Sequence, residues 1–307
     1  MQFNEFLGIK IAERPRKPRN VGLTMVNDMG WPSQFTEDAF RAFGDYVDIL
    51  KFPSRLLTWN VEVIKEKIKL CERYDVLPQP GGLLIEIARA QGQGKQILQK
   101  FKELGFANVE ISNSEGSDRN MAREREFVDL CKSLGFGIIG EVGKKFPTGD
   151  VTRTSDRELN VKETIKQFQD LLDMGAKHVY WEGHLLRRVV GETGDEILSR
   201  WKQVGPQIES VVREVGLDKI VFEVSTHVPY THRRQQQFWW VKTFGPTVNI
   251  GNVRLDEVPL LEDVRRGVMP IFGFGELGDH PWMQSVERGK GSAGEKWWSE
   301  PTRVETV

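Results

Sequence analysis

The chain has 307 residues, with 43 Lys and Arg against 44 Asp and Glu, and only two Cys. Nucleic-acid binding is disfavoured because it normally requires a basic excess, and two Cys are too few for a disulfide scaffold. No apolar run reaches the roughly 18–20 residues that cross a bilayer, and the N-terminus does not resemble a signal peptide. We therefore predict a cytoplasmic protein without nucleic-acid or membrane partners.

Short apolar segments rich in β-branched residues recur along the chain and predict strands. They occupy residues 21–26, 47–52, 76–79, 108–112, 137–143, 178–183, 219–224 and 247–253. Longer amphipathic segments lie between them, for example VKETIKQFQDLLDMG, with apolar residues at helical spacing. Several of these end in Gly, which commonly closes a helix. The pattern predicts eight alternating strand–helix units.

Eight such units in about 250 residues match the size of a (β/α)8 TIM barrel in the α/β class. An open, doubly wound sheet is the alternative. We assign residues 1–268 to one barrel with a short N-terminal arm. Residues 269–307 form a C-terminal extension that we expect to pack on the barrel or on a partner subunit, and we expect a homo-oligomer.

In such barrels the chemistry lies at the carboxyl ends of the strands, and only alternate side chains face inward. On strand one we assign Asp28, with Thr24, to the inward parity. The polar residues late in the other predicted strands are Lys51, Glu110, Ser112, Glu141, Lys145, Glu182, His184, Glu223, Ser225, Asn249, Gly251 and Asn252. An unpaired carboxylate is costly to bury, so acidic groups on strands four to seven indicate a site. We interpret it as a site for a divalent cation and a small anionic substrate, with the lysines as counter-charges. A network of buried ion pairs, such as Glu141 with Lys145, is the alternative.

Two basic segments have no assigned role in this site. The run His232, Arg233 and Arg234 is expected to be a solvated loop or helix start. The basic arm that contains Arg14, Lys17 and Arg19 is expected to be solvated, or else to cover one end of the barrel.

At these same strand ends the sequence resembles the phosphosulfolactate synthase family. The resemblance extends in order from about Arg16 to Gly267. It is carried by the segments PRNVGLTMVNDMG, GDYVDILKF, PGGLLIEIA, LGFANVEISNSEG, GEVGKKFP, GAKHVYWEG, IVFEVS, FGPTVNIGNV and LLEDVRRG. The family fold is a (β/α)8 barrel. Its enzymes are lyases that add sulfite to phosphoenolpyruvate, with magnesium, on a coenzyme M route.

The resemblance also implies roles for individual residues. Lys145, the second lysine of EVGKK, would be the general acid that protonates an enolate, beside Glu141. Lys51 would contact phosphate or carboxylate, and the amides near Gly251 and Asn252 would hold the phosphate. Further substrate contacts are expected from Ser112, His184, Asn249 and Arg266. The candidate ligands of Mg²⁺, or groups behind those ligands, are Asp28, Glu110, Glu141, Glu182 and Glu223.

Several loops at the strand ends depart from the family pattern. Leu83 replaces a family Thr, Asn113 replaces an acid, and His184 with Leu185 replaces an Arg–Glu pair. Three hypotheses follow. The first is the family reaction. The second is a repurposed barrel lyase or synthase that uses the enolate site on another substrate, possibly in specialised metabolism. The third is a non-catalytic paralogue similar to a plant branch of the family that is associated with heat stress.

Overall fold

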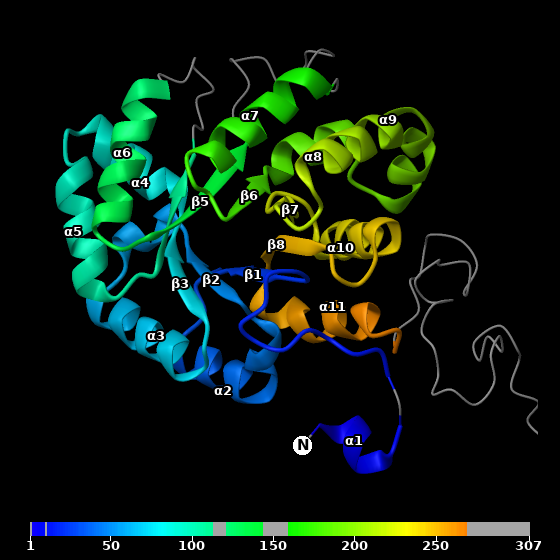
Figure 1. The fold of residues 1–307 in the computed structure, drawn as a ribbon. Coiled ribbons are helices and arrows are strands. Elements are labelled where there is room, and N and C mark those ends of the chain that lie inside the picture. Colours follow the sequence, from blue (N-terminus) through cyan, green and yellow to red (C-terminus); the bar gives the residue numbers. More distant parts are fainter. Residues whose placement is uncertain (1, 10, 113–120, 144–158, 269–307) are drawn as a thin grey trace, which may run out of the picture.

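Eight parallel strands form one sheet that curls into a nearly closed barrel, as the sequence predicts (Figure 1). This computed structural model describes residues 2–9, 11–112, 121–143 and 159–268. The strands are β1 (Thr24–Asn27), β2 (Ile49–Phe52), β3 (Leu77–Pro80), β4 (Asn108–Ile111), β5 (Gly137–Val142), β6 (His178–Trp181), β7 (Ile220–Glu223) and β8 (Asn249–Val253). Their order is β3-β2-β1-β8-β7-β6-β5-β4. Next to β4, the Ala107 amide donates to the Pro78 carbonyl of β3 at 2.9 Å, so the two ends of the sheet approach each other.

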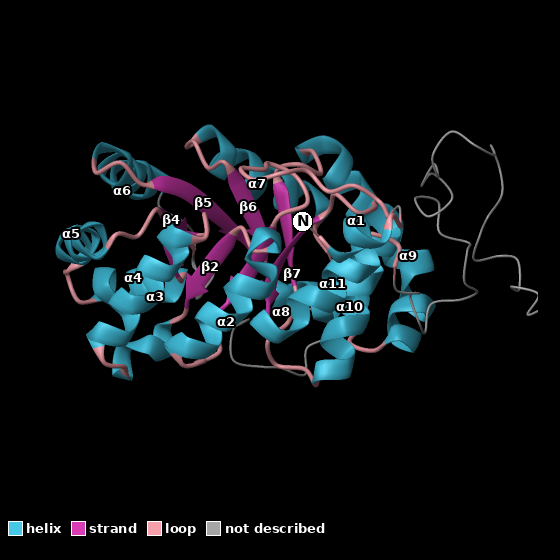
Figure 2. Cartoon of the chain, turned by 90° about the horizontal axis from the view of Figure 1, so that it is seen from below, coloured by secondary structure: helices cyan, strands magenta, loops and turns pink. Residues whose placement is uncertain are grey.

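Helices surround the strands, which occupy the centre of the molecule (Figure 2). The helices are α1 (Phe3–Leu7), α2 (Ser33–Phe43), α3 (Val61–Arg73), α4 (Gly82–Ala90), α5 (Gly94–Leu104), α6 (Met121–Ser133), α7 (Val161–Asp173), α8 (Gly183–Val190), α9 (Gly194–Val215), α10 (Tyr230–Phe244) and α11 (Val258–Arg265), with short 3-10 turns at Gly44–Tyr46, Ser54–Thr58 and Leu255–Glu257. Within the described residues, no helix is both long and apolar enough to cross a membrane. Cys71 and Cys131 are buried and form no disulfide.

Side-chain alternation divides the apolar core into two parts. One face of each strand packs against the helices in a large cluster, in which Trp181 lies edge-on to Phe168 with ring centroids 5.5 Å apart. The other face points into the barrel, where a separate small cluster fills the lumen. Its members are Met25, Ile49, Ile139, Tyr180 and Val221. The lumen is therefore packed rather than open, as expected for a barrel of eight strands.

The basic arm that precedes β1 covers the amino-terminal end of the barrel. Arg14 Nε lies 2.9 Å from the Glu262 carboxylate, and Arg19 Nε lies 3.1 Å from that of Asp48. Lys17 donates to three backbone carbonyls, at 2.8–3.1 Å. The arm is thus a structural cover, which is the second of the two alternatives considered from the sequence.

Asn249 lies at the amino-terminal start of β8, away from the carboxyl ends of the strands. Its Oδ1 accepts a hydrogen bond from the Leu23 amide at 2.9 Å, and its Nδ2 donates to the carbonyls of Asp218 and Ile220. The expectation that Asn249 contacts substrate does not fit this position. The reason is that strand parity specifies the face of a residue but not its height along the barrel.

We predict that Asn249→Leu lowers the free energy of unfolding by about 1–3 kcal/mol, because it leaves a buried amide and buried carbonyls without partners. Chemical denaturation at neutral pH measures the change. The matched control is Gln99→Leu on the exposed face of α5, for which we expect a change within about 0.5 kcal/mol. Equal effects of the two substitutions would contradict the role assigned to Asn249.

Candidate functional site

A layer of buried polar side chains lies inside the barrel on the carboxyl-terminal side of the small apolar cluster, and Tyr180 belongs to both. We call it the interior polar layer; its members are Lys51, Gln79, Glu110, Glu141, Tyr180 and Glu223. Each is no more than 6% exposed. Strand pairing brings them together, with Lys51 beside Gln79 on β2 and β3, and Glu141 beside Tyr180 on β5 and β6.

Lys51 is at the centre of this layer. Its Nζ lies 2.8 Å from Glu110 Oε2 and 3.1 Å from Glu223 Oε1, so one ammonium group bridges β4 and β7 across the lumen. An ammonium group has three N–H donors. Two of its contacts are with these carboxylates, and Nζ also lies over the Tyr180 ring, 4.9 Å from the ring centroid. Lys51 is therefore a structural bridge whose ammonium group also faces the Tyr180 ring.

Gln79 and Tyr180 extend the network, although neither was expected from the sequence to be a site residue. Tyr180 donates its hydroxyl hydrogen to Gln79 Oε1 at 3.0 Å, and Gln79 Nε2 donates to Glu110 Oε2 at 3.1 Å. The alternation of side chains along a strand would have identified both. Tyr180 lies two residues before Glu182 and thus on the same face, and Gln79 ends the predicted third strand. They were missed because a neutral amide and a phenol carry weaker chemical signals than carboxylates.

The charges of the layer hold two of its groups in defined protonation states. Burial alone would lower the pKa of Lys51, but the carboxylates of Glu110, Glu223 and Glu141 outweigh it and raise that pKa above its ordinary value. Burial, with the charges of Glu110 and Glu223, raises the pKa of Tyr180 well above its usual range. Near neutral pH, Lys51 is therefore a cation and Tyr180 a neutral hydrogen-bond donor.

Three predicted residues lie around the carboxyl end of the barrel next to this layer. Glu182 is buried and caps α8, its Oε2 accepting a hydrogen bond from the Leu185 amide at 3.0 Å. Ser112 donates its hydroxyl hydrogen to Glu86 of α4. The His184 ring stacks on His227, with centroids 4.5 Å apart and planes at 17°. His227 comes from the β7–α10 loop and was not selected from the sequence.

Gly251 and Asn252 lie where β8 ends. A Cβ at Gly251 would come within 3.0 Å of Met25 Cε and 3.2 Å of Glu223 Cγ, so only glycine fits without displacing its neighbours. Asn252 has a left-handed backbone, with φ 55°, and its side chain accepts a hydrogen bond from Asn27 Nδ2 at 3.3 Å. The carboxyl end of β8 is therefore tightly constrained next to the interior polar layer.

Arg233 fixes this constrained turn and is not the solvated residue that the sequence led us to expect. It is 3% exposed and makes a bidentate pair with Glu257 at 2.8 and 3.0 Å. It also donates to the carbonyls of Ser225 and Asn252 at 2.8 and 2.7 Å. Arg233 thus joins the ends of β7 and β8. Its burial depends on where α10 packs, which charge patterning does not reveal.

Two further predicted residues lie elsewhere. Asp28 faces α3, where Lys67 Nζ lies 2.6 Å from its Oδ2; it is Met25 and not Thr24 that joins the lumen cluster, so the parity assigned to strand one was wrong. The strand TMVN is buried on both faces, which removes the polar alternation that reveals parity. Arg266 binds the Ala12 carbonyl and Gln2 in the N-terminal arm, at the opposite end of the barrel from the interior polar layer.

The remaining predictions concern the general acid and the metal. Lys145 lies outside the described residues, as does the extension that begins at residue 269. In the part of the chain that the structure describes, no group of three His, Cys, Asp or Glu side chains converges as metal ligands. Glu223 Oε2 is nevertheless buried and accepts no hydrogen bond from those residues. Mg²⁺ is commonly bound through one or two carboxylates, with water and substrate oxygens completing its shell, so this oxygen is compatible with one ligand position.

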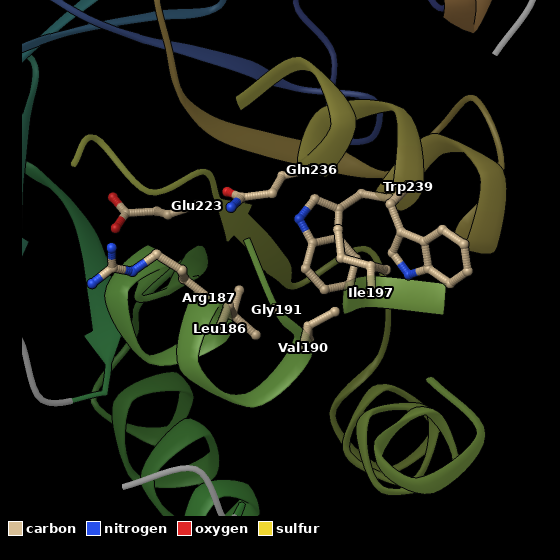
Figure 3. Close-up of a pocket in the computed structure, with 9 residues that line it drawn as sticks. Leu186, Arg187, Val190, Gly191, Ile197, Glu223, Gln236 and Trp239 are labelled. Carbon is tan, nitrogen blue, oxygen red and sulfur yellow. The ribbon is translucent and has the colours of Figure 1, made fainter. Parts of the chain in front are cut away.

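A narrow pocket adjoins Glu223 between α8, α9 and α10. Arg187, Gln236 and Trp239 line it, and the side chains of Arg187 and Gln236 extend towards the same region as that of Glu223 (Figure 3). Arg187 Nη1 pairs with Glu192 at 2.7 Å, while its Nε is buried and has no described acceptor. Arg187 therefore places a guanidinium group, with its charge paired to Glu192 and one N–H donor left, next to the interior polar layer.

Comparison with known proteins identifies relatives that match most of this chain. The model of the (2R)-phospho-3-sulfolactate synthase (ComA) family matches residues 12–270. The phosphosulfolactate synthase of Methanocaldococcus jannaschii is 32% identical over 248 residues, which cover 80% of this chain and 92% of the relative. That of Methanothermobacter thermautotrophicus is 30% identical over 83% of this chain and 92% of the relative. That of Bacillus subtilis is 27% identical over 86% and 97%.

We predict that Lys51→Met lowers the free energy of unfolding by about 3–5 kcal/mol at pH 7, because it leaves Glu110 and Glu223 buried without a cation. Protonation of the carboxylates in acid would relieve this unpaired negative charge. The lost stability would therefore be smallest in acid and would grow as the pH rises from about 5 to 8. Denaturant titrations at several pH values measure this slope.

In the wild type the raised pKa of Lys51 keeps its contribution present throughout that range, and the contribution is lost only as the pH rises through the raised value. Lys65→Met is the control, because Lys65 pairs with Glu62 on the exposed surface of α3, where such pairs contribute about 0–1 kcal/mol. A Lys51→Met variant whose stability did not fall with rising pH would contradict the bridge.

Proposed function

Because the chain belongs to the phosphosulfolactate synthase family, a family of lyases, we propose that it forms a carbon–sulfur bond by adding sulfite to phosphoenolpyruvate. The product would be phosphosulfolactate. The proposal rests mainly on the family match over residues 12–270. The interior polar layer supports it, since Lys51 provides a fixed cation at the barrel end where this fold carries its chemistry.

The proposed reaction consists of an addition and a protonation. The sulfur lone pair of sulfite attacks C3 of phosphoenolpyruvate, and the electrons of the C2–C3 double bond move onto C2 and its carboxylate as an enolate. A proton then adds to C2, and no bond to the phosphate breaks. On the family resemblance we assign that proton to Lys145.

The described residues have distinct parts in this scheme. Lys51 donates an N–H to an oxygen of the developing enolate, in exchange for its contact with the Tyr180 ring, and Glu110 and Glu223 keep it charged and in place. This is electrostatic stabilisation by a preorganised group. The backbone at Asn252 receives the phosphate and Arg233 holds that turn, whereas Gly251 is paired with Glu223 in the β7–β8 ladder. Arg187 compensates part of the negative charge of the substrate.

Mg²⁺ is the cofactor that we propose. Glu223, through Oε2, would hold it together with Glu110 or Glu141, while Asp28 and Glu182 are engaged with α3 and α8. When bound, it would supply positive charge that offsets the anionic substrate and the enolate. We also propose that the protein acts in the cytoplasm as a homo-oligomer; cell fractionation and light scattering would test these two statements.

One observation favours a second function, in which the same enolate site acts on a less anionic substrate. His184 and His227 form a stacked imidazole pair at the end of β6, where the family has an Arg–Glu pair. Leu83 also lies on α4 in place of a hydroxyl. Replacing charged groups removes charge-assisted hydrogen bonds worth about 1.5–3 kcal/mol each, so a substrate with fewer charges would lose less.

The test is to incubate the purified protein with phosphoenolpyruvate, sulfite and Mg²⁺ and to follow phosphosulfolactate by phosphorus NMR and mass spectrometry. We expect product from the wild type, and a rate at least about 100-fold lower from Lys145→Ala, as for loss of a general acid. Lys162→Ala, on the exposed surface of α7, is the control and should retain the wild-type rate. Chelation of the metal should also abolish turnover.

Other outcomes separate the alternatives. Without product, a Mg²⁺-dependent rise in melting temperature together with turnover of another enol phosphate would support the repurposed enzyme. Without product, metal response or turnover of any such substrate, a correctly folded protein would be a non-catalytic paralogue, and both enzymatic proposals would be wrong.

A further inference from the structure

A pocket of about 150 Å³ lies at the amino-terminal end of the barrel, on the other side of the lumen cluster from Glu110 and Glu223. We call it the amino-end pocket. Leu23, Ile49, Leu77 and Ile139 provide an apolar wall, and Arg19, Lys177 and His178 provide polar groups. Its volume is similar to that of a protein cavity that accommodates one benzene molecule.

The amino-end pocket is one layer of side chains away from the interior polar layer. On five strands, a residue that lines the pocket lies two positions before a member of that layer. These lining residues are Ile49, Leu77, Asn108, Ile139 and His178. Side chains two positions apart on a strand share a face and are separated by roughly 6.6 Å. The pocket is therefore a separate space, and it does not open into the candidate active site.

Arg19 provides a fixed positive charge in this wall. Its side chain is only 3% exposed, with Nε 3.1 Å from Asp48 Oδ1 and Nη2 donating to the Asp45 carbonyl. Its Nη1 is buried and makes no hydrogen bond with a described residue. Burial lowers the pKa of Arg19 and Asp48 opposes that effect, but a guanidinium remains charged at neutral pH. An unsatisfied charged donor of this kind favours a negatively charged acceptor.

The charged residues that line the amino-end pocket, Arg19 included, sum to one excess positive charge. Lys17, Arg19 and Lys177 oppose Asp48 and Asp75 in the lining. Lys17 uses its three N–H donors on backbone carbonyls, whereas the exposed Lys177 side chain forms no ion pair with a described residue. Arg19 and Lys177 are thus the groups available to an anion.

His178 does not add to this charge. Its Nε2 lies 3.2 Å from the Asn20 carbonyl and must carry the hydrogen. Burial lowers the pKa of His178, so the ring is neutral at physiological pH. A ligand with one negative charge and a short apolar body therefore matches the lining better than inorganic phosphate, which carries more charge and has no apolar surface.

We propose that the amino-end pocket binds a small organic monocarboxylate, with its carboxylate on Arg19 and Lys177 and its apolar body against Leu77, Ile49 and Ile139. This site is independent of the reaction proposed above, because it shares no residue with the interior polar layer.

The test is isothermal titration of the full chain with benzoate, with benzyl alcohol as the uncharged analogue and inorganic phosphate as the anion without an apolar body. We expect benzoate to bind with a Kd below roughly 1 mM, and the other two to bind at least tenfold more weakly. Saturating phosphoenolpyruvate should leave the benzoate affinity unchanged. Competition by phosphoenolpyruvate, or equal binding of all three probes, would overturn the proposal.

Two variants locate the binding. Leu77→Trp fills the pocket from a position that is 48% exposed, so it should abolish benzoate binding without lowering the melting temperature. Leu198→Trp, at a position that is 40% exposed on α9, is its control and should bind as the wild type does. Lys177→Met should weaken binding about fivefold to tenfold, and Lys202→Met on α9 should not. Unchanged binding by Leu77→Trp would refute the site, whatever the outcome of the sulfite assay.

Discussion

The bridge from Lys51 to Glu110 and Glu223 is the interaction on which the interior of this barrel depends. Carboxylates on β4 and β7 cannot both be ionised in a packed lumen unless a cation lies between them. Lys51 provides that cation at 2.8 and 3.1 Å. The same contacts keep the lysine charged, while its ammonium group also faces the Tyr180 ring. The same three side chains therefore stabilise the barrel and provide charged groups that could act on a substrate.

Other buried pairs position this centre without joining it. Arg233 and Glu257 hold the ends of β7 and β8 together, and Asp28 with Lys67 fixes the end of β1 to α3. The basic arm performs a similar task at the amino-terminal end. The near-zero net charge of the chain thus hides a set of specific buried pairs. Each fixes one strand end, and the pairs at Arg233 and Asp28 do so at the carboxyl end of the barrel.

The site residues show what a pattern of residues can predict. Glu110, Glu141, Glu223 and Lys51 were selected because polar groups at the ends of apolar strands are costly to bury, and all four lie in the interior polar layer. Gln79, Tyr180, Arg187 and His227 were missed, because their position depends on neighbours distant in sequence. Asn249 and Arg266 were expected to contact substrate but lie at the amino-terminal end. Both residue types can bind an anionic substrate. Their position along the barrel axis, however, depends on the register of the strands and on where α11 packs.

The sequence by itself determined the eight strand–helix units, the parallel barrel and the family, because hydrophobic periodicity and motif order are local properties of the chain. Only the tertiary structure decided which carboxylates share a cation, that Asp28 faces α3, and that Arg233 is buried. These facts depend on strand register and on the direction in which each helix packs. Both are set by contacts between residues far apart in sequence. The energies of such contacts cannot be deduced from any single segment of the chain.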